Sequence, residues 1–197
     1  GGIIFYPLQF DIVEFLTGSE RMVRVFRQGK CICSNGRKKC AECRKNPWRE
    51  EVVEQKIEIP PGATEFHRVI AKGLGDAGKG RGAADIVFTI YCKPDPLFKR
   101  DGPDVLTNIS INLATALHGG TVALENFDGQ RIEVDIEAGI QHGEVRRIPN
   151  QGLPYYLDNT KRGDLVVTFS IDFPESLTDE QKKIIQEVLP DDDSFYE

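Results

Sequence analysis

Apolar and polar residues alternate with a period of two along much of this chain. The clearest case is VEQKIEI (53–59), which ends at Pro60-Pro61-Gly62. Such alternation predicts a β-strand with one buried face. Further short apolar runs bounded by Gly, Pro or Asp predict more strands: DIVEFL (11–16), RMVRVF (21–26), FHRVIA (66–71), ADIVFTIYC (84–92), VLTNISINL (105–113) and LVVTFSIDF (165–173). We therefore expect a mainly β fold, with strands at the spacing of β-sandwiches.

Two connections between these strands have turn signals. VALENF (122–127) and RIEVDI (131–136) flank Asp128-Gly129, which predicts a type I′ hairpin. Thr17-Gly18-Ser19 separates DIVEFL from RMVRVF and predicts the turn that joins these two strands.

Only the segment SLTDEQKKIIQEVLP (176–190) has a helical pattern. Thr178 is a predicted N-cap with Gln181 three residues later, and acidic residues follow the cap. Pro190 ends the helix, and the tail 191–197 is expected to be flexible. The apolar residues of the helix form one stripe: Leu177, Ile184, Ile185, Val188 and Leu189.

The chain contains a loose internal repeat. IEIPPGATEFHRVIAKGLG (57–75) and VDIEAGIQHGEVRRIPNQGLP (134–154) share a strand, x-x-Gly, a basic strand and x-x-Gly-Leu. This self-similarity predicts two β-sandwich-like domains in tandem. The expected boundaries are a first domain 1–98 with a cysteine-rich insertion 31–49, a second domain 99–175, the helix 176–190 and the tail 191–197.

Composition excludes several classes of function. The 197 residues are 40% hydrophobic and 28% charged, which is typical of a soluble globular protein. The net charge of −6 argues against nucleic-acid binding, because no basic excess is present to neutralise phosphates. No apolar run approaches the roughly 20 residues of a membrane span. The first ten residues lack the basic region and cleavage site of a targeting peptide.

The glycine-rich segment KGLGDAGKGRG (72–82) resembles a nucleotide-binding loop. GLGDAGK (73–79) fits the first seven positions of a P-loop and also contains GxGxxG. A P-loop requires Ser or Thr after the lysine and a helix after the loop. Here Gly80 follows Lys79, and the next residues favour a strand. We therefore predict a glycine-rich connection between two strands of the first domain.

Four of the five cysteines lie within thirteen residues, in CICSNGRKKCAEC: Cys31, Cys33, Cys40 and Cys43. Such a cluster is either a metal site or a set of disulfides. Four thiolates suit one tetrahedral zinc ion, but CxC is an awkward pair of ligands, so disulfides are the preferred interpretation. Four cysteines allow three pairings, which the sequence does not distinguish. Cys92 ends a predicted strand and is interpreted as a small buried apolar residue.

Cys40-Ala-Glu-Cys43 is also a CxxC motif in basic surroundings, which would lower the pKa of a thiol. A thiol–disulfide oxidoreductase is therefore an alternative function, although no thioredoxin-like pattern accompanies the motif. Hydrolysis by a serine or cysteine nucleophile has no support, since GxSxG is absent.

Three groups of motifs together resemble the C-terminal, substrate-binding region of J-domain co-chaperones, the DnaJ family. KIEIPPG (56–62) with AKGLGDAGKGRGAADIVFTI (71–90) is similar to the family's V-x-I-x-x-G … G-x-G-x-x-x-x-x-x-G-D-L-x-x-x-I. The segment 94–136, which contains PLFKRDGPDVL and FDG, resembles H-x-x-F-x-R-x-G-x-D-L … L-D-G. The segment 147–175, which contains NQGLP and RGDLVVTFSIDFP, resembles G-x-G-M-P … G-D-L-x-V-x-F-x-I-x-F-P. None of the three histidines precedes proline, so the His-Pro-Asp signature of the J-domain is absent and we expect the client-holding part of a longer protein.

The resemblance implies a co-chaperone fragment and not an enzyme. In the family, an unfolded client adds a β-strand to a sheet edge, fills an apolar pocket, and is handed to a seventy-kilodalton heat-shock chaperone. No cofactor is implied, apart from the alternative of zinc at the four clustered cysteines. A scaffold that only dimerises is a further alternative. The implied client-binding residues are Leu8, Val23, Val25, Ile57 and Phe98, and those of a homodimer are Ile184, Ile185, Val188 and Leu189.

The short cysteine-rich insertion resembles that of ER-lumenal members, which carry disulfides instead of zinc. The resemblance thus implies the endoplasmic reticulum lumen and a BiP-type partner, with the cytoplasm as the alternative. Asn108-Ile-Ser110 is a glycosylation sequon and a candidate modification site.

Overall fold

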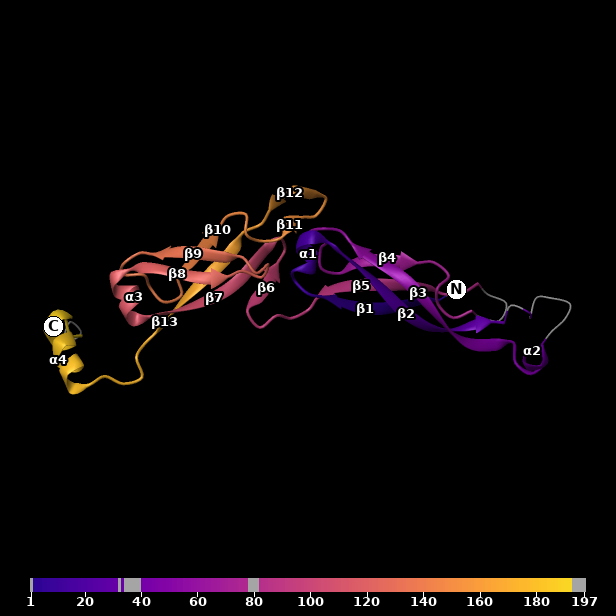
Figure 1. Cartoon of the computed structure of the whole chain (residues 1–197), viewed down its shortest axis with the longest axis horizontal. Helices are drawn as coiled ribbons and strands as arrows, with labels where there is room; N and C mark the ends of the chain where they lie inside the picture. The colour runs from indigo at the N-terminus through magenta and orange to yellow at the C-terminus, as the bar shows by residue number, and fades with distance from the viewer. Residues whose placement is uncertain (1, 32, 34–39, 78–81, 193–197) are drawn as a thin grey trace. The chain divides into compact units, whose positions relative to one another are not determined.

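The fold is mainly β, as expected, with a short C-terminal helix (Figure 1). The computed structural model describes residues 2–31, 33, 40–77 and 82–192. The expected flexible tail lies largely outside the described residues. The elements are β1 (Ile3–Phe10), α1 (Glu14–Thr17), β2 (Ser19–Lys30), α2 (Ala41–Lys45), β3 (Trp48–Ile59), β4 (His67–Ala71), β5 (Asp85–Cys92), β6 (Phe98–Asp101), β7 (Asp104–Asn112), α3 (Leu113–His118), β8 (Gly120–Glu125), β9 (Arg131–Ile136), β10 (Val145–Ile148), β11 (Pro154–Tyr155), β12 (Asp158–Arg162), β13 (Leu165–Asp172) and α4 (Asp179–Val188).

The chain divides into two compact units, each built from several segments. Unit 1 comprises residues 1–107, 125–130 and 146–167, and unit 2 comprises residues 108–124, 131–145 and 168–197. The long strands β7 and β13 contribute residues to both units. The expected domain boundaries at residues 98 and 175 stay a prediction.

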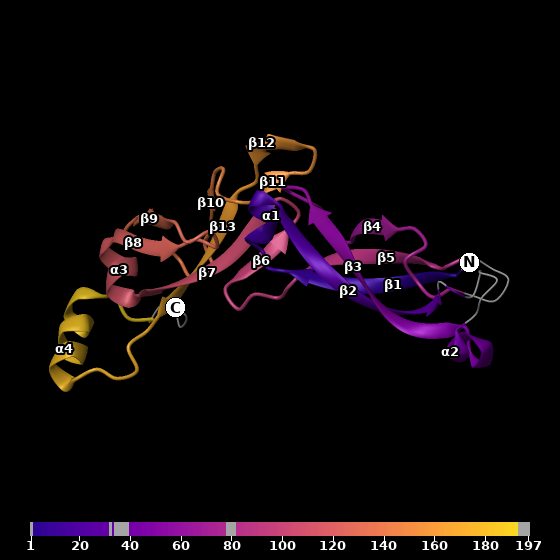
Figure 2. The ribbon, with the colours of Figure 1, turned by 45° about the vertical axis from the view of Figure 1, so that its right-hand side comes forward.

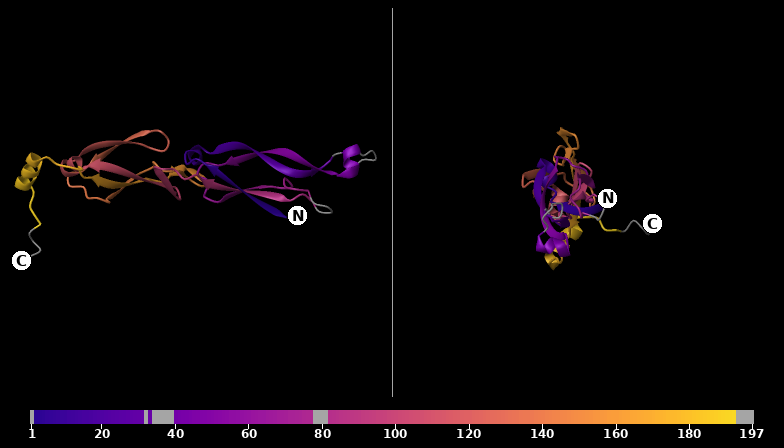
Figure 3. Two further views of the ribbon diagram at one scale, coloured as in Figure 1. Left: turned by 90° about the horizontal axis from the view of Figure 1, so that it is seen from below. Right: turned by 90° about the vertical axis from the view of Figure 1, so that its right-hand side faces the viewer.

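Unit 1 contains a three-stranded sheet and a long hairpin. The sheet has the order β1-β5-β4, with β1 parallel and β4 antiparallel to β5. The hairpin pairs β2 with β3 along twelve residues of each strand. Figure 3 shows the hairpin as a second layer beside the three-stranded sheet. Large apolar side chains from both layers are fully buried, among them Phe10, Ile57, Phe88 and Ile90.

The remaining strands form one four-stranded sheet, with the order β10-β13-β7-β6, and two hairpins, β11-β12 and β8-β9. Unit 2 also contains α3 and α4. Helix α4 starts with the expected capping box, in which Gln181 N donates to Thr178 Oγ1 (3.2 Å) and Thr178 N donates to Gln181 Oε1 (2.9 Å). None of the described helices is long and apolar enough to cross a membrane.

The strand predicted over DIVEFL (11–16) is wrong, because this segment turns into α1. Its buried residues, Ile12 and Phe15, are three positions apart, which suits a helical turn. Asp11 N donates to the Glu14 carboxylate (2.7 Å), and the turn ends at Gly18, whose φ is +77°. The hydrogen-bonded turn therefore replaces the expected strand, and β1 lies just before it.

The hairpin at Asp128-Gly129 is present, but its predicted type I′ turn is wrong. A type I′ turn needs positive φ at both central residues, whereas only Gly129 has it (+80°). Gly129 N donates to Asn126 O (2.9 Å), and Asn126 N donates to Gln130 O (2.8 Å). This pattern fits a three-residue loop in which a type I turn precedes a left-handed glycine.

The glycine-rich connection of residues 72–82 joins β4 to β5, as predicted. The strand β5, and not a helix, follows it. A phosphate would therefore meet no helix N-terminus at this position. Lys79 and Gly80 lie outside the described residues.

Three motifs of unit 1 meet at Pro103. Leu153 N donates to Pro103 O (2.8 Å), and Gly163 N donates to Leu153 O (2.8 Å). Asp164 N donates to Asp104 Oδ1 (2.8 Å), and Arg147 bridges the carboxylates of Asp104 and Asp164 at 2.6 and 3.0 Å. The segments NQGLP, RGDL and DGPD thus build a structural junction.

Gly163→Ala is expected to destabilise the protein. A Cβ at position 163 would overlap the Pro103 carbonyl, which is backbone and cannot turn away. We expect a loss of about 2–4 kcal/mol in the free energy of unfolding, measured by denaturant titration. Gly82→Ala is the control, because no atom lies within 4 Å of its Cβ position. Equal stability of the two variants would contradict this account of the junction.

Candidate functional site

Among the strands of the described residues, β2 pairs with β3 alone. Its ladder with β3 runs from Ser19↔Ile59 to Lys30↔Trp48, and Cys31 N extends it by donating to Pro47 O (2.9 Å). Successive residues of a strand direct their backbone groups to opposite sides, so the odd-numbered residues face β3.

The even-numbered residues of β2 face the other side. At Gln28 this side is occupied, because Gln28 N donates to Asp76 Oδ1 (2.7 Å) and Gln28 O accepts from Ala77 N (3.0 Å). Four earlier residues have no backbone partner within the described part of the chain: Glu20, Met22, Arg24 and Phe26. An open edge of this kind is a template for an added strand.

Apolar side chains lie on both faces next to this edge. Val23 and Val25 point inward and are buried (8% and 6% exposed). Met22 and Phe26 point outward and are 56% and 78% exposed, and Phe26 lies opposite the exposed Val52. A strand added here would meet apolar side chains on both of its faces.

The structure brings three of the five predicted client-binding residues to one face. Val23, Val25 and Ile57 are on the inner face of the β2–β3 hairpin, and Ile57 is a diagonal neighbour of Val23 in the register. Leu8 is buried on β1, in the other sheet. Arg21 connects these layers, since its Nη1 donates to Gln9 O (2.8 Å). The four aliphatic residues therefore belong to the core of unit 1.

Phe98 is the half-buried member of the predicted set, at the start of β6. Its ring packs edge-on against Phe127, with centroids 6.1 Å apart. It also lines a hollow of about 390 Å³ together with Cys92, Lys93, Pro94, Asp95, Lys99, Arg100 and Glu65. The side chain of Phe98 thus combines a packing contact with an accessible surface.

Sequence reasoning missed Met22 and Phe26. They occupy the outward positions of an alternating strand, where polar residues are usual. Their signal is in RMVRVF, in which Met22 and Phe26 stand at even positions beside the buried valines. An apolar residue on the polar side of a strand marks an interaction surface.

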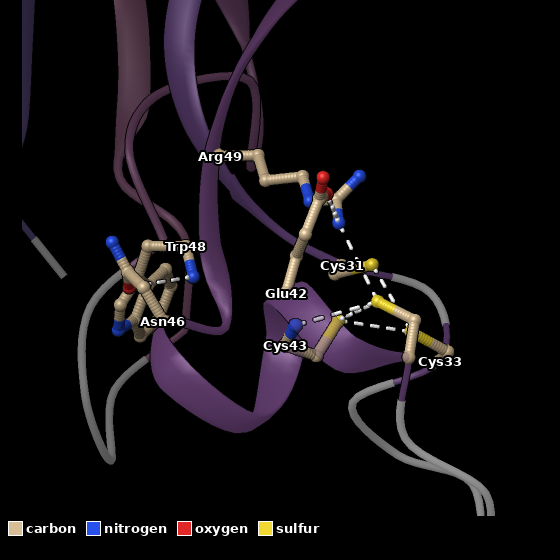
Figure 4. A network of polar contacts seen from close by, with 8 residues as sticks. Cys31, Cys33, Glu42, Cys43, Asn46, Trp48 and Arg49 are labelled. Atoms are coloured by element: carbon tan, nitrogen blue, oxygen red, sulfur yellow. Dashed lines mark hydrogen bonds and ion pairs between the residues drawn. The ribbon is translucent and has the colours of Figure 1, made fainter.

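Helix α2 lies at the far end of the β2–β3 hairpin (Figure 2), and the side chains of Cys31, Cys33 and Cys43 converge next to it (Figure 4). All four sulfurs lie within 4.8 Å of one another. The Sγ–Sγ distances are 3.2 Å for Cys31–Cys33, 2.9 Å for Cys33–Cys43 and 3.0 Å for Cys40–Cys43. All are free thiols in this structure, since a disulfide bond is about 2.05 Å long.

The arrangement of the thiols fits zinc. Four sulfurs from two segments point to one centre, as a closed structural zinc site requires. Cys43 is buried, and its N–H donates to the sulfur of Cys40 (3.3 Å), which caps α2. The predicted disulfides stay a prediction.

Electrostatic contacts favour a thiolate in this cluster. Hydrogen bonds from the thiols of Cys43 and Cys33 lower the pKa of Cys31, whereas the bond to Cys31 raises the pKa of Cys43. Arg49 is 3.4 Å from the Cys40 sulfur and forms an ion pair with Glu42. A metal binds the thiolate form, so a partly deprotonated cluster suits metal binding.

The redox alternative has less support from these contacts. Cys40 is exposed at the start of α2, but this helix has only five residues. The described elements around it are the antiparallel strands β2 and β3, and not the βαβ unit of thioredoxin-like enzymes.

Three of the four residues predicted to form a dimer lie on α4, which has no buried side chain, and Leu189 is its C-cap. Ile184, Val188 and Leu189 are 52%, 69% and 46% exposed. Ile185 lines an apolar hollow of about 490 Å³ within unit 2, together with Leu113, Leu117, Phe173, Pro174 and Leu177. Asn108, the glycosylation candidate, is exposed on β7.

Known proteins match most of this chain. The family model "DnaJ C terminal domain" matches residues 4–174. Human DnaJ homolog subfamily B member 5 is 37% identical over 95% of this chain and 51% of its own length. DnaJ homolog dnj-20 of Caenorhabditis elegans is 35% identical over 77% of this chain and 43% of its own. Chaperone protein DnaJ of Fusobacterium nucleatum subsp. polymorphum is 32% identical over 76% of this chain and 38% of its own.

The chain thus spans about half or less of the length of these relatives. Their names describe a chaperone protein and DnaJ homologues. The match of the family model includes the open strand β2 and extends into unit 2 as far as residue 174. The chain therefore belongs to the DnaJ C-terminal domain family.

Proposed function

We propose that unit 1 binds unfolded polypeptide clients by strand addition to the outer edge of β2. The observation that carries this proposal is the row of unpartnered backbone groups at Glu20, Met22, Arg24 and Phe26. Backbone hydrogen bonds do not depend on the client's sequence, so they suit a protein that binds many clients. Client side chains on the inner face lie beside Val23 and Val25, and those on the outer face lie beside Met22 and Phe26. The site therefore prefers extended, apolar segments.

The five residues implied by the family resemblance then have different roles. Leu8, Val23, Val25 and Ile57 form the buried support of the edge, with Val23 and Val25 next to the client. Phe98 presents a half-buried ring at its own hollow. The full-length protein hands the client to a seventy-kilodalton heat-shock chaperone, as family membership supports.

Phe26→Ala is expected to weaken client binding without lowering stability. Its side chain is 78% exposed, so its removal costs little core packing. We expect a loss of about three- to tenfold in affinity for a labelled seven-residue apolar peptide, measured by fluorescence anisotropy. Suppression of aggregation of a reduced model substrate should fall in parallel.

Phe173→Ala is the matched control, because this phenylalanine is 70% exposed but lies in unit 2. It should bind the peptide as the unmodified protein does. An equal loss of affinity in both variants, or in neither, would contradict client binding at β2.

We propose further that α4 forms a homodimer through its exposed apolar stripe. Ile184 and Val188, four residues apart, lie on one side of the helix and are more than half exposed. A second copy of the stripe would cover these side chains. Two client sites in one dimer raise the avidity for a long client through effective concentration.

Ile184→Asp combined with Val188→Asp is expected to produce a monomer. Buried carboxylates at a dimer interface would carry a large desolvation cost. Light scattering coupled to gel filtration should give half the mass of the unmodified chain. Gln186→Asp, a change at an exposed position of the same helix, should leave the dimer intact. A monomeric unmodified chain would refute the dimer.

The cysteine cluster is proposed as a structural clamp on the far end of the β2–β3 hairpin. The convergence of all four sulfurs supports one zinc ion held by Cys31, Cys33, Cys40 and Cys43. Zinc would supply cross-links and no chemistry, because a site with four thiolates leaves no open position. The disulfide alternative belongs to the ER-lumenal proposal, with a BiP-type partner and a sugar at the exposed Asn108.

Zinc analysis and thiol alkylation on the same sample separate these two forms. The zinc form predicts about one metal ion per chain and five alkylated cysteines after denaturation with a chelator. Cys43→Ser should lose the metal and lower the melting temperature, whereas Cys92→Ser should retain the metal. Four protected cysteines and no metal would contradict the zinc form and support the ER-lumenal one.

A further inference from the structure

The turn of residues 73–77 occupies the outer edge of β2 at one position. The Gln28 N–H donates to Asp76 Oδ1 (2.7 Å), and the Gln28 carbonyl accepts from Ala77 N (3.0 Å). Both backbone groups that Gln28 directs to this edge are therefore used. The four preceding even-numbered residues of the strand have no such partner within the described chain.

The turn is fixed to the rest of unit 1 by its own contacts. Gly75 N donates to Ala84 O (2.8 Å), and Ala84 N donates to Asp76 O (3.0 Å). Leu74 is buried (8% exposed), and Gly75 packs closely, since a Cβ there would lie only 3.0 Å from the Cβ and carbonyl oxygen of Ala84. These contacts hold Asp76 in place before any client arrives.

Arg27 fastens the same turn to β2. Its Nη1 donates to the carbonyls of Gly73 (3.1 Å) and Leu74 (3.3 Å), and its Nε donates to Glu51 on β3 (2.6 Å). Arg27 thus ties the turn to β2 and is itself held by Glu51 of β3. The side chains of Arg27 and Asp76 therefore fix the position of the turn relative to Gln28.

We propose that residues 73–77 act as an edge stop that limits the length and sets the register of the bound client. This inference rests on the proposed client site on β2. A client strand pairs with Glu20, Met22, Arg24 and Phe26, a stretch of roughly seven residues in which only alternate residues face the client. At Gln28 the ladder ends, because Asp76 and Ala77 already hold both groups. A longer client must leave the sheet at this point.

The stop also explains why a glycine-rich segment lies next to a strand edge. Gly75 permits the close approach of the turn to Ile4 and Ala84. Gly73 adopts a positive φ (+65°), which side-chain-bearing residues rarely tolerate. The feature that resembles a phosphate loop in the sequence is therefore a device that ends strand pairing.

A peptide length series tests this inference. One peptide has a seven-residue apolar core, and two eleven-residue peptides carry the same core with four threonines added at one end or the other. In the unmodified protein, neither extension should raise the affinity by more than about twofold, because β2 begins at Ser19 at one end of the client site and Gln28 is closed at the other. In the double variant Asp76→Ala/Ala77→Pro, which lacks both bonds to Gln28, one extended peptide should bind about tenfold tighter.

Single variants keep the test decisive if the double variant does not fold. Asp76→Ala should raise the affinity of the same extended peptide about threefold, since it frees one donor. Asp76→Asn retains an acceptor oxygen and should behave as the unmodified protein does. Asp101→Ala, an exposed aspartate on β6, is the matched control and should show no length effect.

The outcomes separate the stop from the client site. Absence of a length effect in folded Asp76→Ala and double variants, with intact binding of the seven-residue peptide, would overturn the stop and leave the client site standing. A gain of affinity on extension in the unmodified protein would overturn the stop as well. If the seven-residue peptide fails to bind the unmodified protein, both proposals fall.

Discussion

A strand that is hydrogen-bonded on one side and open on the other is the constraint on which the rest of this structure depends. The backbone groups at the open side of β2 are fixed in direction by the long ladder to β3, so the edge is ready for a partner strand. Open edges also invite aggregation. Here the charged side chains of Glu20 and Arg24 alternate with Met22 and Phe26 along the edge, and charged residues on an edge strand limit such aggregation.

The surrounding contacts hold this strand at both ends. Near its start, Arg21 donates to Gln9 O and stacks over the ring of Phe10 at 3.9 Å, which joins β2 to β1. At its far end the cysteine cluster follows directly, because Cys31 continues the ladder to Pro47. Between these two ends, the Asp76 carboxylate accepts a hydrogen bond from Gln28 N and so occupies the open edge at that residue. A fixed edge loses little conformational entropy when a client binds, which favours affinity without many specific contacts.

Much of this fold follows from local sequence, and its exceptions have physical reasons. The sequence correctly predicts the strand at VEQKIEI and the capping box of Thr178 and Gln181. Both depend only on residues that are close together in the chain. DIVEFL fails because a run of only six residues is too short for its apolar pattern to separate a strand from a turn of helix. The turn at Asp128-Gly129 fails because one residue, Asp128, avoids the left-handed conformation.

The candidate site is harder to predict, because it depends on pairs that are distant in the chain. Gln28 and Asp76 are 48 positions apart, and no periodicity links them. Val23 is buried and Met22 is exposed, although both are apolar and adjacent in the sequence. The four cysteines are the opposite case, since their spacing alone predicts that they gather.

Residue-resolved hydrogen exchange of β2 with and without a seven-residue apolar peptide tests the central claim most directly. Strand addition predicts that the peptide slows exchange of the Met22, Arg24 and Phe26 amides by about tenfold or more, since these gain hydrogen bonds. The amides of Val23 and Val25, already bonded to β3, should change little. Equal slowing of odd and even residues, or slowing confined to another strand, would contradict client binding at the open edge of β2.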